Sequence, residues 1–250
     1  MWFEFILTTE CNWNCPYCTF DRVDNSYATK EKILEHQYIF DLMKKIDNVT
    51  VVCEGGEIGL IQDNDLLEFL FRQINIPVII NTNGLFFESD RTILYPYIDK
   101  VFYHIAPDTK KMVKVEPLDV PFEVVYGIVD DDIEQMNKFV EYNSHLNIEY
   151  QEYEYISKLP MDTTKSLSQQ IACKTLNPFV CIDLSREVLQ PCSARGSHVT
   201  IPLTEKNLIN VLTKYNNFEY NDMCDTCYRM STNNNILDVM KRKKQLGGIL

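Results

Sequence analysis

The stretch Thr9-Glu10-Cys11-Asn12-Trp13-Asn14-Cys15-Pro16-Tyr17-Cys18 decides the fold, and it directly follows an apolar run over residues 2–7. The apolar run predicts a buried strand, so the three cysteines occupy the loop that leaves that strand. Cysteine thiolates are the usual ligands of iron–sulfur clusters. A structural zinc site takes four protein ligands, whereas a four-iron cluster held by three cysteines keeps one iron open. The C-x3-C-x2-C spacing therefore favours a 4Fe-4S cluster. The alternative is a zinc knuckle completed by a distant histidine, the first of which is His36.

Strand-like and helix-like segments alternate after this loop. Strands are expected at 49–53, 77–80, 101–105, 122–129 and 146–153, and helices at 30–47, 64–74, 90–98 and from about 130 to 142. Such alternation predicts a parallel sheet with helical crossovers. A closed eightfold barrel usually needs about 250 residues. The expected fold class is therefore α/β, a partial (β/α)6 TIM-like barrel that stays open.

Two further motifs directly follow predicted strands. The second strand ends in Glu54-Gly55-Gly56-Glu57, and the third ends in Asn81-Thr82-Asn83-Gly84-Leu85. Ligands of parallel sheets bind at the carboxyl ends of the strands. Glycines let a backbone approach a ligand closely, a carboxylate can pair with an ammonium group, and amide and hydroxyl groups suit ribose hydroxyls. Each motif alone is also typical of a simple turn.

The cysteine loop, with aromatic Tyr17 before its last cysteine, resembles the cluster loop of the radical S-adenosylmethionine (SAM) superfamily. The two later motifs resemble that family's GGE and TNG segments, although Ile58 stands where the family usually has proline. The resemblance implies that SAM chelates the open iron and yields a 5′-deoxyadenosyl radical, which abstracts hydrogen from a substrate. It implies that the ligands of this cluster are Cys11, Cys15 and Cys18. It further implies SAM contacts at Tyr17, Gly55, Gly56, Glu57, Asn81, Thr82, Asn83, Gly127 and Ile128.

Two residues on later strands are catalytic candidates. His104 lies next to the end of the predicted fourth strand, and Tyr153 ends the sixth. A lone histidine on a strand is more often a packed residue, and a tyrosine at a strand end more often fills an interface. Both nevertheless lie where SAM or a substrate would bind.

The C-terminal region carries a second cysteine pattern. It consists of Cys173, a hairpin over 179–184 and 188–192 that ends in Cys192, a helix over about 207–217, and Cys224 with Cys227. This pattern resembles the twitch domain, the short form of the SPASM auxiliary-cluster module. The resemblance implies a second, fully ligated 4Fe-4S cluster on Cys173, Cys192, Cys224 and Cys227. A four-cysteine zinc ribbon is the alternative. Cys53 and Cys181 are expected to be buried structural residues, with Cys181 in place of Cys173 as a second possible ligand set.

The expected organisation is a radical SAM core over residues 1–156, a twitch domain over 157–235 and a C-terminal tail over 236–250. The expected function is a radical SAM oxidoreductase that performs a two-electron oxidation or a cross-link on a peptide or a small polar substrate. A flavodoxin or ferredoxin is the expected electron donor. If the substrate is a precursor peptide, a separate protein is expected to bind the leader segment of that peptide. The alternatives are an epimerase or mutase without net oxidation, and a non-enzymatic iron–sulfur or zinc redox sensor.

The amino-acid composition limits the kinds of partner that we expect this protein to bind. The net charge is −12 and the sequence pI about 4.8, which argues against binding through nucleic-acid phosphates. Apolar segments are too short to span a membrane. Nine cysteines without a secretory leader favour metal chemistry over disulfides and a cytoplasmic protein.

Overall fold

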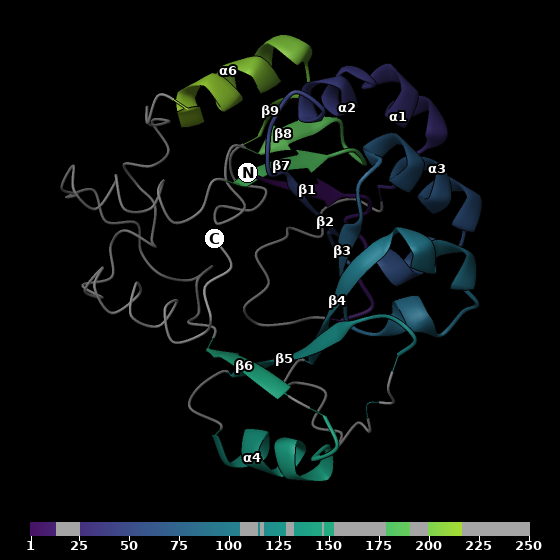
Figure 1. Cartoon of the computed structure of the whole chain (residues 1–250), viewed down its shortest axis with the longest axis vertical. Coiled ribbons are helices and arrows are strands. Elements are labelled where there is room, and N and C mark those ends of the chain that lie inside the picture. The colour runs from purple at the N-terminus through teal and green to yellow at the C-terminus, as the bar shows by residue number, and fades with distance from the viewer. Residues whose placement is uncertain are drawn as a thin grey trace, which may run out of the picture.

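A single mixed sheet organises the chain in the computed structural model (Figure 1). The structure describes residues 1–13, 26–105, 115, 118–128, 133–146, 148–152, 179–190 and 200–216. Within these ranges nine strands follow one another in the order β6-β5-β4-β3-β2-β1-β7-β8-β9. The strands are β1 (Trp2–Ile6), β2 (Thr50–Glu54), β3 (Val78–Thr82), β4 (Ile98–Ile105), β5 (Phe122–Ile128), β6 (Ile148–Glu152), β7 (Phe179–Asp183), β8 (Val188–Gln190) and β9 (Ile201–Pro202).

Strands β1 to β6 are the predicted parallel units, and each pairs with its successor along the chain. The connecting helices are α1 (Lys30–Glu35), α2 (Tyr38–Met43), η1 (Ile58–Leu60), α3 (Asn64–Ile74), η2 (Leu85–Phe87), η3 (Thr92–Tyr97) and α4 (Ile133–Tyr142), and α6 (Glu205–Asn216) follows β9. Because β6 and β9 end the sheet order, the sheet is open rather than closed. The expected α/β fold with an open, barrel-like parallel sheet is confirmed.

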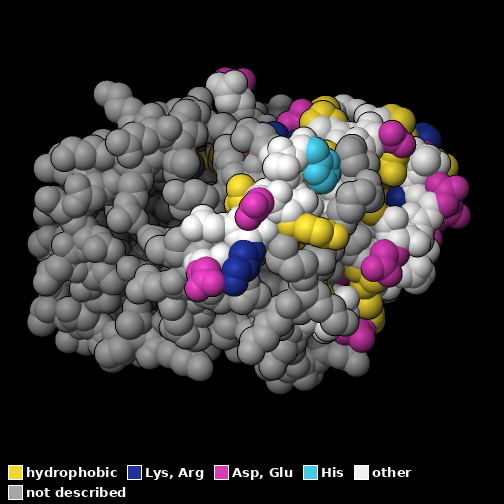
Figure 2. Space-filling view, turned by 90° about the horizontal axis from the view of Figure 1, so that it is seen from below, with side chains coloured by type: hydrophobic (Ala, Val, Ile, Leu, Met, Phe, Trp, Pro, Cys, Tyr) yellow, Lys and Arg dark blue, Asp and Glu magenta, His cyan; other side chains and the backbone are white. Residues whose placement is uncertain are grey.

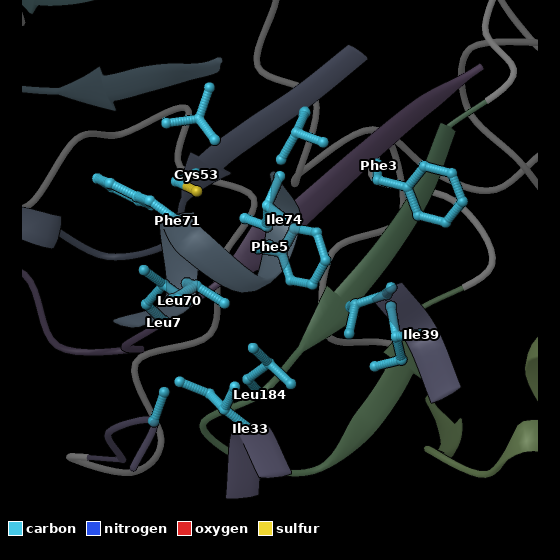
Figure 3. Packing of buried hydrophobic residues seen from close by; sticks show 14 of the residues in the cluster. Phe3, Phe5, Leu7, Ile33, Ile39, Cys53, Leu70, Phe71, Ile74 and Leu184 are labelled. Atoms are coloured by element: carbon cyan, nitrogen blue, oxygen red, sulfur yellow. The ribbon is translucent and has the colours of Figure 1, made fainter. Parts of the chain in front are cut away.

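One face of the sheet packs against helices and forms the core. Alternate strand residues on this face are 0% exposed: Phe3, Phe5, Val51, Cys53, Val78, Ile80 and Val101. They pack against apolar residues of α1, α2 and α3, among them Ile33, Ile39 and Leu70 (Figure 3). Since side chains alternate along a strand, the residues between them lie on the opposite, inner face. That face carries the polar side chains Glu4, Glu54, Asn81 and His104.

The segment over residues 30–47 differs from its prediction as a single helix. It forms two short helices, because the amide of Gln37 donates to the carbonyl of Leu34 at 3.2 Å and tightens the turn between them. At the junction, Nε2 of His36 lies 3.3 Å from Oε1 of Glu187. The break between α1 and α2 thus lets His36, the C-cap of α1, contact the turn between β7 and β8.

The C-terminal hairpin was predicted within a separate domain, and in the structure it extends the core sheet. Strand β7 pairs in parallel with β1, from Trp2 opposite Phe179 to Ile6 opposite Asp183. Strand β8 is antiparallel to β7, as predicted, and the short strand β9 was not predicted. The division into core, twitch domain and tail stays a prediction, since residues 153–178 and 217–250 lie outside the described ranges.

Candidate cofactor site at the carboxyl edge of the sheet

The cysteine loop is closed at its base just beyond β1. The amide of Thr9 donates to the carbonyl of Ser26 at 3.3 Å, and the amide of Ala28 donates to the carbonyl of Leu7 at 2.8 Å. Cys11 follows this closure and is partly exposed at the carboxyl edge of the sheet. Cys15, Tyr17 and Cys18 lie outside the described residues.

The Glu-Gly-Gly-Glu turn is held against the start of this loop by backbone hydrogen bonds. The amide of Gly56 donates to the carbonyl of Thr8, and that of Glu57 to the carbonyl of Glu10, each at 2.8 Å. A Cβ atom on Gly55 would lie 2.4 Å from the Thr8 oxygen, and one on Gly56 would lie 1.9 Å from the Glu10 oxygen. Gly55 also has φ +140°, which disfavours other residues. Both glycines are therefore required by the approach of the cysteine loop.

The Glu57 carboxylate is buried, with 1% of the residue exposed, and it accepts hydrogen bonds from the chain itself. Oε1 accepts from the amide of Gly59 at 2.6 Å and from the hydroxyl of Thr82 at 2.7 Å, and Oε2 accepts from the amide of Asn83 at 2.7 Å. Burial raises the pKa of Glu57, and these hydrogen bonds oppose the rise. The arrangement makes Glu57 a brace between two turns, and its expected contact with the SAM ammonium group stays a prediction.

Arg91 is a buried side chain near this brace that sequence reasoning missed. Its Nη2 donates to the carbonyls of Gly59 and Ile61 at 3.0 and 2.8 Å, and its guanidinium lies 4.5 Å from the centre of the Phe86 ring. Desolvation lowers the pKa of Arg91, while the Glu57 charge opposes this shift. The positive charge also favours the ionised form of Glu57. No local sequence pattern indicates that an arginine so far along the chain becomes buried here.

Ile58 explains how the chain does without proline after the Glu-Gly-Gly-Glu motif. Its side chain is 0% exposed and belongs to the hydrophobic core. The residue begins η1, whose N-cap is Glu57, with the carboxylate accepting from the Gly59 amide. The turn is thus fixed by packing and by capping.

The Thr82-Asn83-Gly84 turn meets the cysteine loop. The side-chain amide of Asn83 donates to Oδ1 of Asn12 at 2.7 Å, next to Cys11. Thr82 accepts a hydrogen bond from the amide of Gly84 at 3.1 Å, and Gly84 has φ +102°. Asn12 was missed from the sequence, although its place beside a cysteine was a usable signal. The three motifs therefore converge at one edge, as predicted from their positions after strands.

Asn81 and Glu54 form a second polar pair, on the inner face of the sheet. Nδ2 of Asn81 donates to Oε2 of Glu54 at 2.9 Å. Burial raises the pKa of Glu54, and the Asn81 hydrogen bond opposes the rise. Sequence reasoning singled out Asn81 and took Glu54 only as the start of the glycine motif.

The structure describes some of the remaining candidate residues and leaves others outside the described ranges. His104 lies on the inner face of β4, where desolvation lowers its pKa to about 4, so its ring is neutral near pH 7. Gly127 and Ile128 lie at the carboxyl end of β5, and Tyr153 lies outside the described residues. Cys53 and Cys181 are 0% exposed within strands, as expected.

The predicted auxiliary-cluster ligands Cys173, Cys192, Cys224 and Cys227 all lie outside the described residues. Within the described ranges, no three His, Cys, Asp or Glu side chains gather as a metal site. On the face in Figure 2, the coloured acidic side chains are spread among neutral and apolar ones, with few basic ones between them. None of the helices that the structure describes has the length and apolarity needed to cross a membrane.

No protein-family model and no curated protein matches the sequence. Solved structures do match the fold. SuiB from Streptococcus suis, bound to its precursor peptide SuiA, superposes with a TM-score of 0.58 at 14% identity, over 92% of this chain and 70% of SuiB. The enzyme anSMEcpe with bound AdoMet and the Kp18Cys peptide gives a TM-score of 0.56 at 12% identity, over 92% of this chain and 88% of that one.

A third solved structure, BtrN in complex with AdoMet and 2-DOIA, covers the chain almost completely. The TM-score is 0.51 at 13% identity, over 94% of this chain and 92% of BtrN. These three proteins are radical SAM enzymes. At such identities the likeness concerns the fold, and it agrees with the fold that the resemblance to the radical SAM superfamily implied.

Proposed function

The chain has the fold of the radical SAM enzymes, and from this premise we propose that it binds a 4Fe-4S cluster and SAM and works as a radical SAM oxidoreductase. The observation that carries the proposal is the backbone pairing of the glycine turn with the cysteine loop, by the two 2.8 Å hydrogen bonds to Thr8 and Glu10. This pairing brings two motifs 45 residues apart in sequence, counted from Cys11 to Gly56, to one edge of the sheet.

The residues at this edge fit the proposed cofactors. Cys11 is a partly exposed residue on a loop whose base is closed, and its sulfur accepts from the amide of Trp13 at 3.4 Å. Cys15 and Cys18 would complete the ligand set. Gly55 and Gly56 present backbone without side chains, next to the backbone of Thr8 and Glu10 at the start of the cysteine loop. Three protein thiolates leave one iron for an exogenous ligand, which is the opening that SAM requires.

The bound cluster and SAM would supply a 5′-deoxyadenosyl radical that removes a hydrogen atom from the substrate. The chain's own part is to hold the components and exclude water. Gly55 and Gly56 keep the backbone close to the ligand, and Asn81, Thr82 and Asn83 supply polar groups for it. Glu57 fixes the geometry by bracing the turn that carries Asn83.

We also propose contacts to the adenosyl part of SAM from two other places near the glycine turn and the Thr82-Asn83-Gly84 turn. Gly127 and Ile128 end β5 at the same edge of the parallel sheet, and Tyr17 precedes the last loop cysteine. His104, neutral at physiological pH, would act as a hydrogen-bonding group on the inner face rather than as a cation. Tyr153 completes the proposed set on the substrate side.

The oxidoreductase assignment depends on a second cluster. We propose that Cys173, Cys192, Cys224 and Cys227 ligate an auxiliary 4Fe-4S cluster, which would accept the substrate's electron. A flavodoxin or ferredoxin would deliver the first electron. Support for a peptide substrate comes from SuiB and anSMEcpe, which were solved with peptides, while BtrN was solved with 2-DOIA. The substrate class proposed is therefore a peptide or a small polar molecule.

The test is anaerobic reconstitution of the full chain with iron and sulfide, followed by dithionite and SAM. Release of 5′-deoxyadenosine, measured by liquid chromatography and mass spectrometry, is the expected result. The triple variant with alanine for Cys11, Cys15 and Cys18 should release none. A purified protein whose N-terminal site holds zinc, or a triple variant that still forms 5′-deoxyadenosine, would refute the assignment.

Changing Cys224 and Cys227 to alanine separates the two clusters. This double variant should still cleave SAM but form no oxidised product. SAM consumed once per turnover fits oxidation, whereas many turnovers for each SAM would indicate an epimerase or mutase.

A further inference from the structure

Glu54 is a carboxylate at the cofactor edge that the motif comparison leaves without a role. It ends β2 on the inner face, opposite Ile6 of β1 and directly before Gly55. Its carbonyl accepts from the amide of Leu7 at 3.3 Å, so its backbone is tied to the strand that leads into the cysteine loop. Glu54 is half-buried as a residue, whereas Glu57 is buried.

The two glutamates of the motif differ in what surrounds their carboxylates. Both oxygens of Glu57 accept hydrogen bonds from the chain, and Arg91 supplies a nearby positive charge. For Glu54, only Oε2 has a hydrogen bond to a described residue, from Asn81 at 2.9 Å. Among the residues that the structure describes, no Lys, Arg or His forms an ion pair with Glu54.

The Asn81 amide points to a missing donor at the same place. While its nitrogen is used on Glu54, its Oδ1 is buried and accepts no hydrogen bond from the described residues. Buried polar atoms are nearly always paired, and a buried carboxylate without a counter-ion is costly. A ligand that brings a positively charged N–H donor would satisfy both the Asn81 oxygen and the free side of the Glu54 carboxylate.

We propose that Glu54, oriented by Asn81, is the carboxylate that pairs with the α-ammonium group of bound SAM, and that Glu57 is a structural brace. This inference rests on the proposed function, since it presumes that SAM binds at this edge. The ligand chemistry required is a cationic amine, which the methionyl part of SAM carries. A second source of donors at the same site would be the hydroxyl groups of the SAM ribose.

The experiment measures binding rather than turnover. The reconstituted full chain is titrated anaerobically with SAM, and separately with 5′-methylthioadenosine, which has the ribose but no ammonium group. Glu54→Gln should weaken SAM binding at least about tenfold, the range expected for a hydrogen bond to a charged group. Affinity for 5′-methylthioadenosine should stay within about twofold, which is below the energy of one hydrogen bond.

Matched variants separate binding from folding. Glu54→Asp keeps the charge and should recover part of the SAM affinity. Glu57→Gln should lower the thermal midpoint, whereas Glu54→Gln should not. Glu134→Gln, on α4 in an exposed ion pair with Lys138, is the surface control and should change neither affinity.

Each outcome decides the inference. Unchanged SAM affinity in Glu54→Gln overturns it, and equal weakening of SAM and 5′-methylthioadenosine overturns it in favour of a ribose contact. A wild-type chain that takes up the cluster yet binds no SAM would refute the proposed function itself. Loss of SAM affinity alone, with the thermal midpoint retained, supports the ammonium pairing.

Discussion

Replacing Gly56 by alanine tests the contact between the glycine turn and the cysteine loop. The added methyl group would lie 1.9 Å from the carbonyl oxygen of Glu10 and 2.4 Å from its carbonyl carbon. Both atoms belong to backbone, so no side-chain rotation relieves the overlap. The loop must therefore move away from the turn.

The size of the effect follows from two contributions. Overpacking of a tight site costs about 1–3 kcal/mol. Movement of the cysteine loop away from the glycine turn also breaks the hydrogen bond from the amide of Glu57 to the carbonyl of Glu10, which is worth about 1 kcal/mol. The sum of about 2–4 kcal/mol corresponds to a fall in thermal midpoint of about 5–15 °C for a chain of this size.

The assay combines thermal unfolding with cluster content. After anaerobic reconstitution, Gly56→Ala should lose both thermal stability and much of the iron–sulfur absorbance. Gly59→Ala is the matched control, because its methyl group would lie 2.5 and 2.4 Å from backbone of Leu85 and Phe86 and 2.8 Å from Oε1 of Glu57, and not against the cysteine loop. It should lower the thermal midpoint and leave cluster uptake largely intact.

Two results would contradict the reasoning. A Gly56→Ala protein with wild-type midpoint and iron content would show that the loop does not need the close approach. Equal loss of cluster in Gly56→Ala and Gly59→Ala would show that the loss reflects general destabilisation.

Four other predictions follow from the same site. Glu57→Gln should lower the free energy of unfolding by about 1–3 kcal/mol, measured by denaturant titration, because an amide cannot accept all three hydrogen bonds; an unchanged midpoint would exclude the brace. Asn83→Ala removes the bond to Asn12 and should cost about 1 kcal/mol while reducing the iron retained after gel filtration. Burial raises the pKa of Glu54 above its ordinary 4.5, so the stability that comes from its proton is complete below that value and is lost as the pH rises through the folded-state pKa. Glu54→Gln should therefore gain thermal stability relative to the SAM-free wild type as the pH rises above 4.5, and a pH-independent difference would oppose this. The ring of His104 should titrate near pH 4 in NMR spectra, and a midpoint near 6.5 would show that it is not desolvated.

The sequence alone determined which segments form the six parallel strands and the edge of the sheet at which the motifs meet. Periodic apolar residues report which segments form strands, and alternation with helices forces the parallel arrangement. Because parallel strands share a carboxyl edge, motifs after β1, β2 and β3 had to converge. The sequence also indicated that Gly55 and Gly56 serve a close approach of backbone, but it assigned that approach to a ligand, and the structure shows the cysteine loop against them.

Only the tertiary structure decided that the carboxylate of Glu54 lies on the inner face of the sheet and that the carboxylate of Glu57 is hydrogen-bonded within the fold. Glu54 and Glu57 are equivalent as letters of one motif, and they differ through Asn81, Thr82 and Arg91, all more than 20 residues away. The placement of β7 beside β1 is equally long-range. Local patterns encode backbone conformation and burial, whereas hydrogen-bond partners and charge pairing depend on segments that meet only when the sheet has formed.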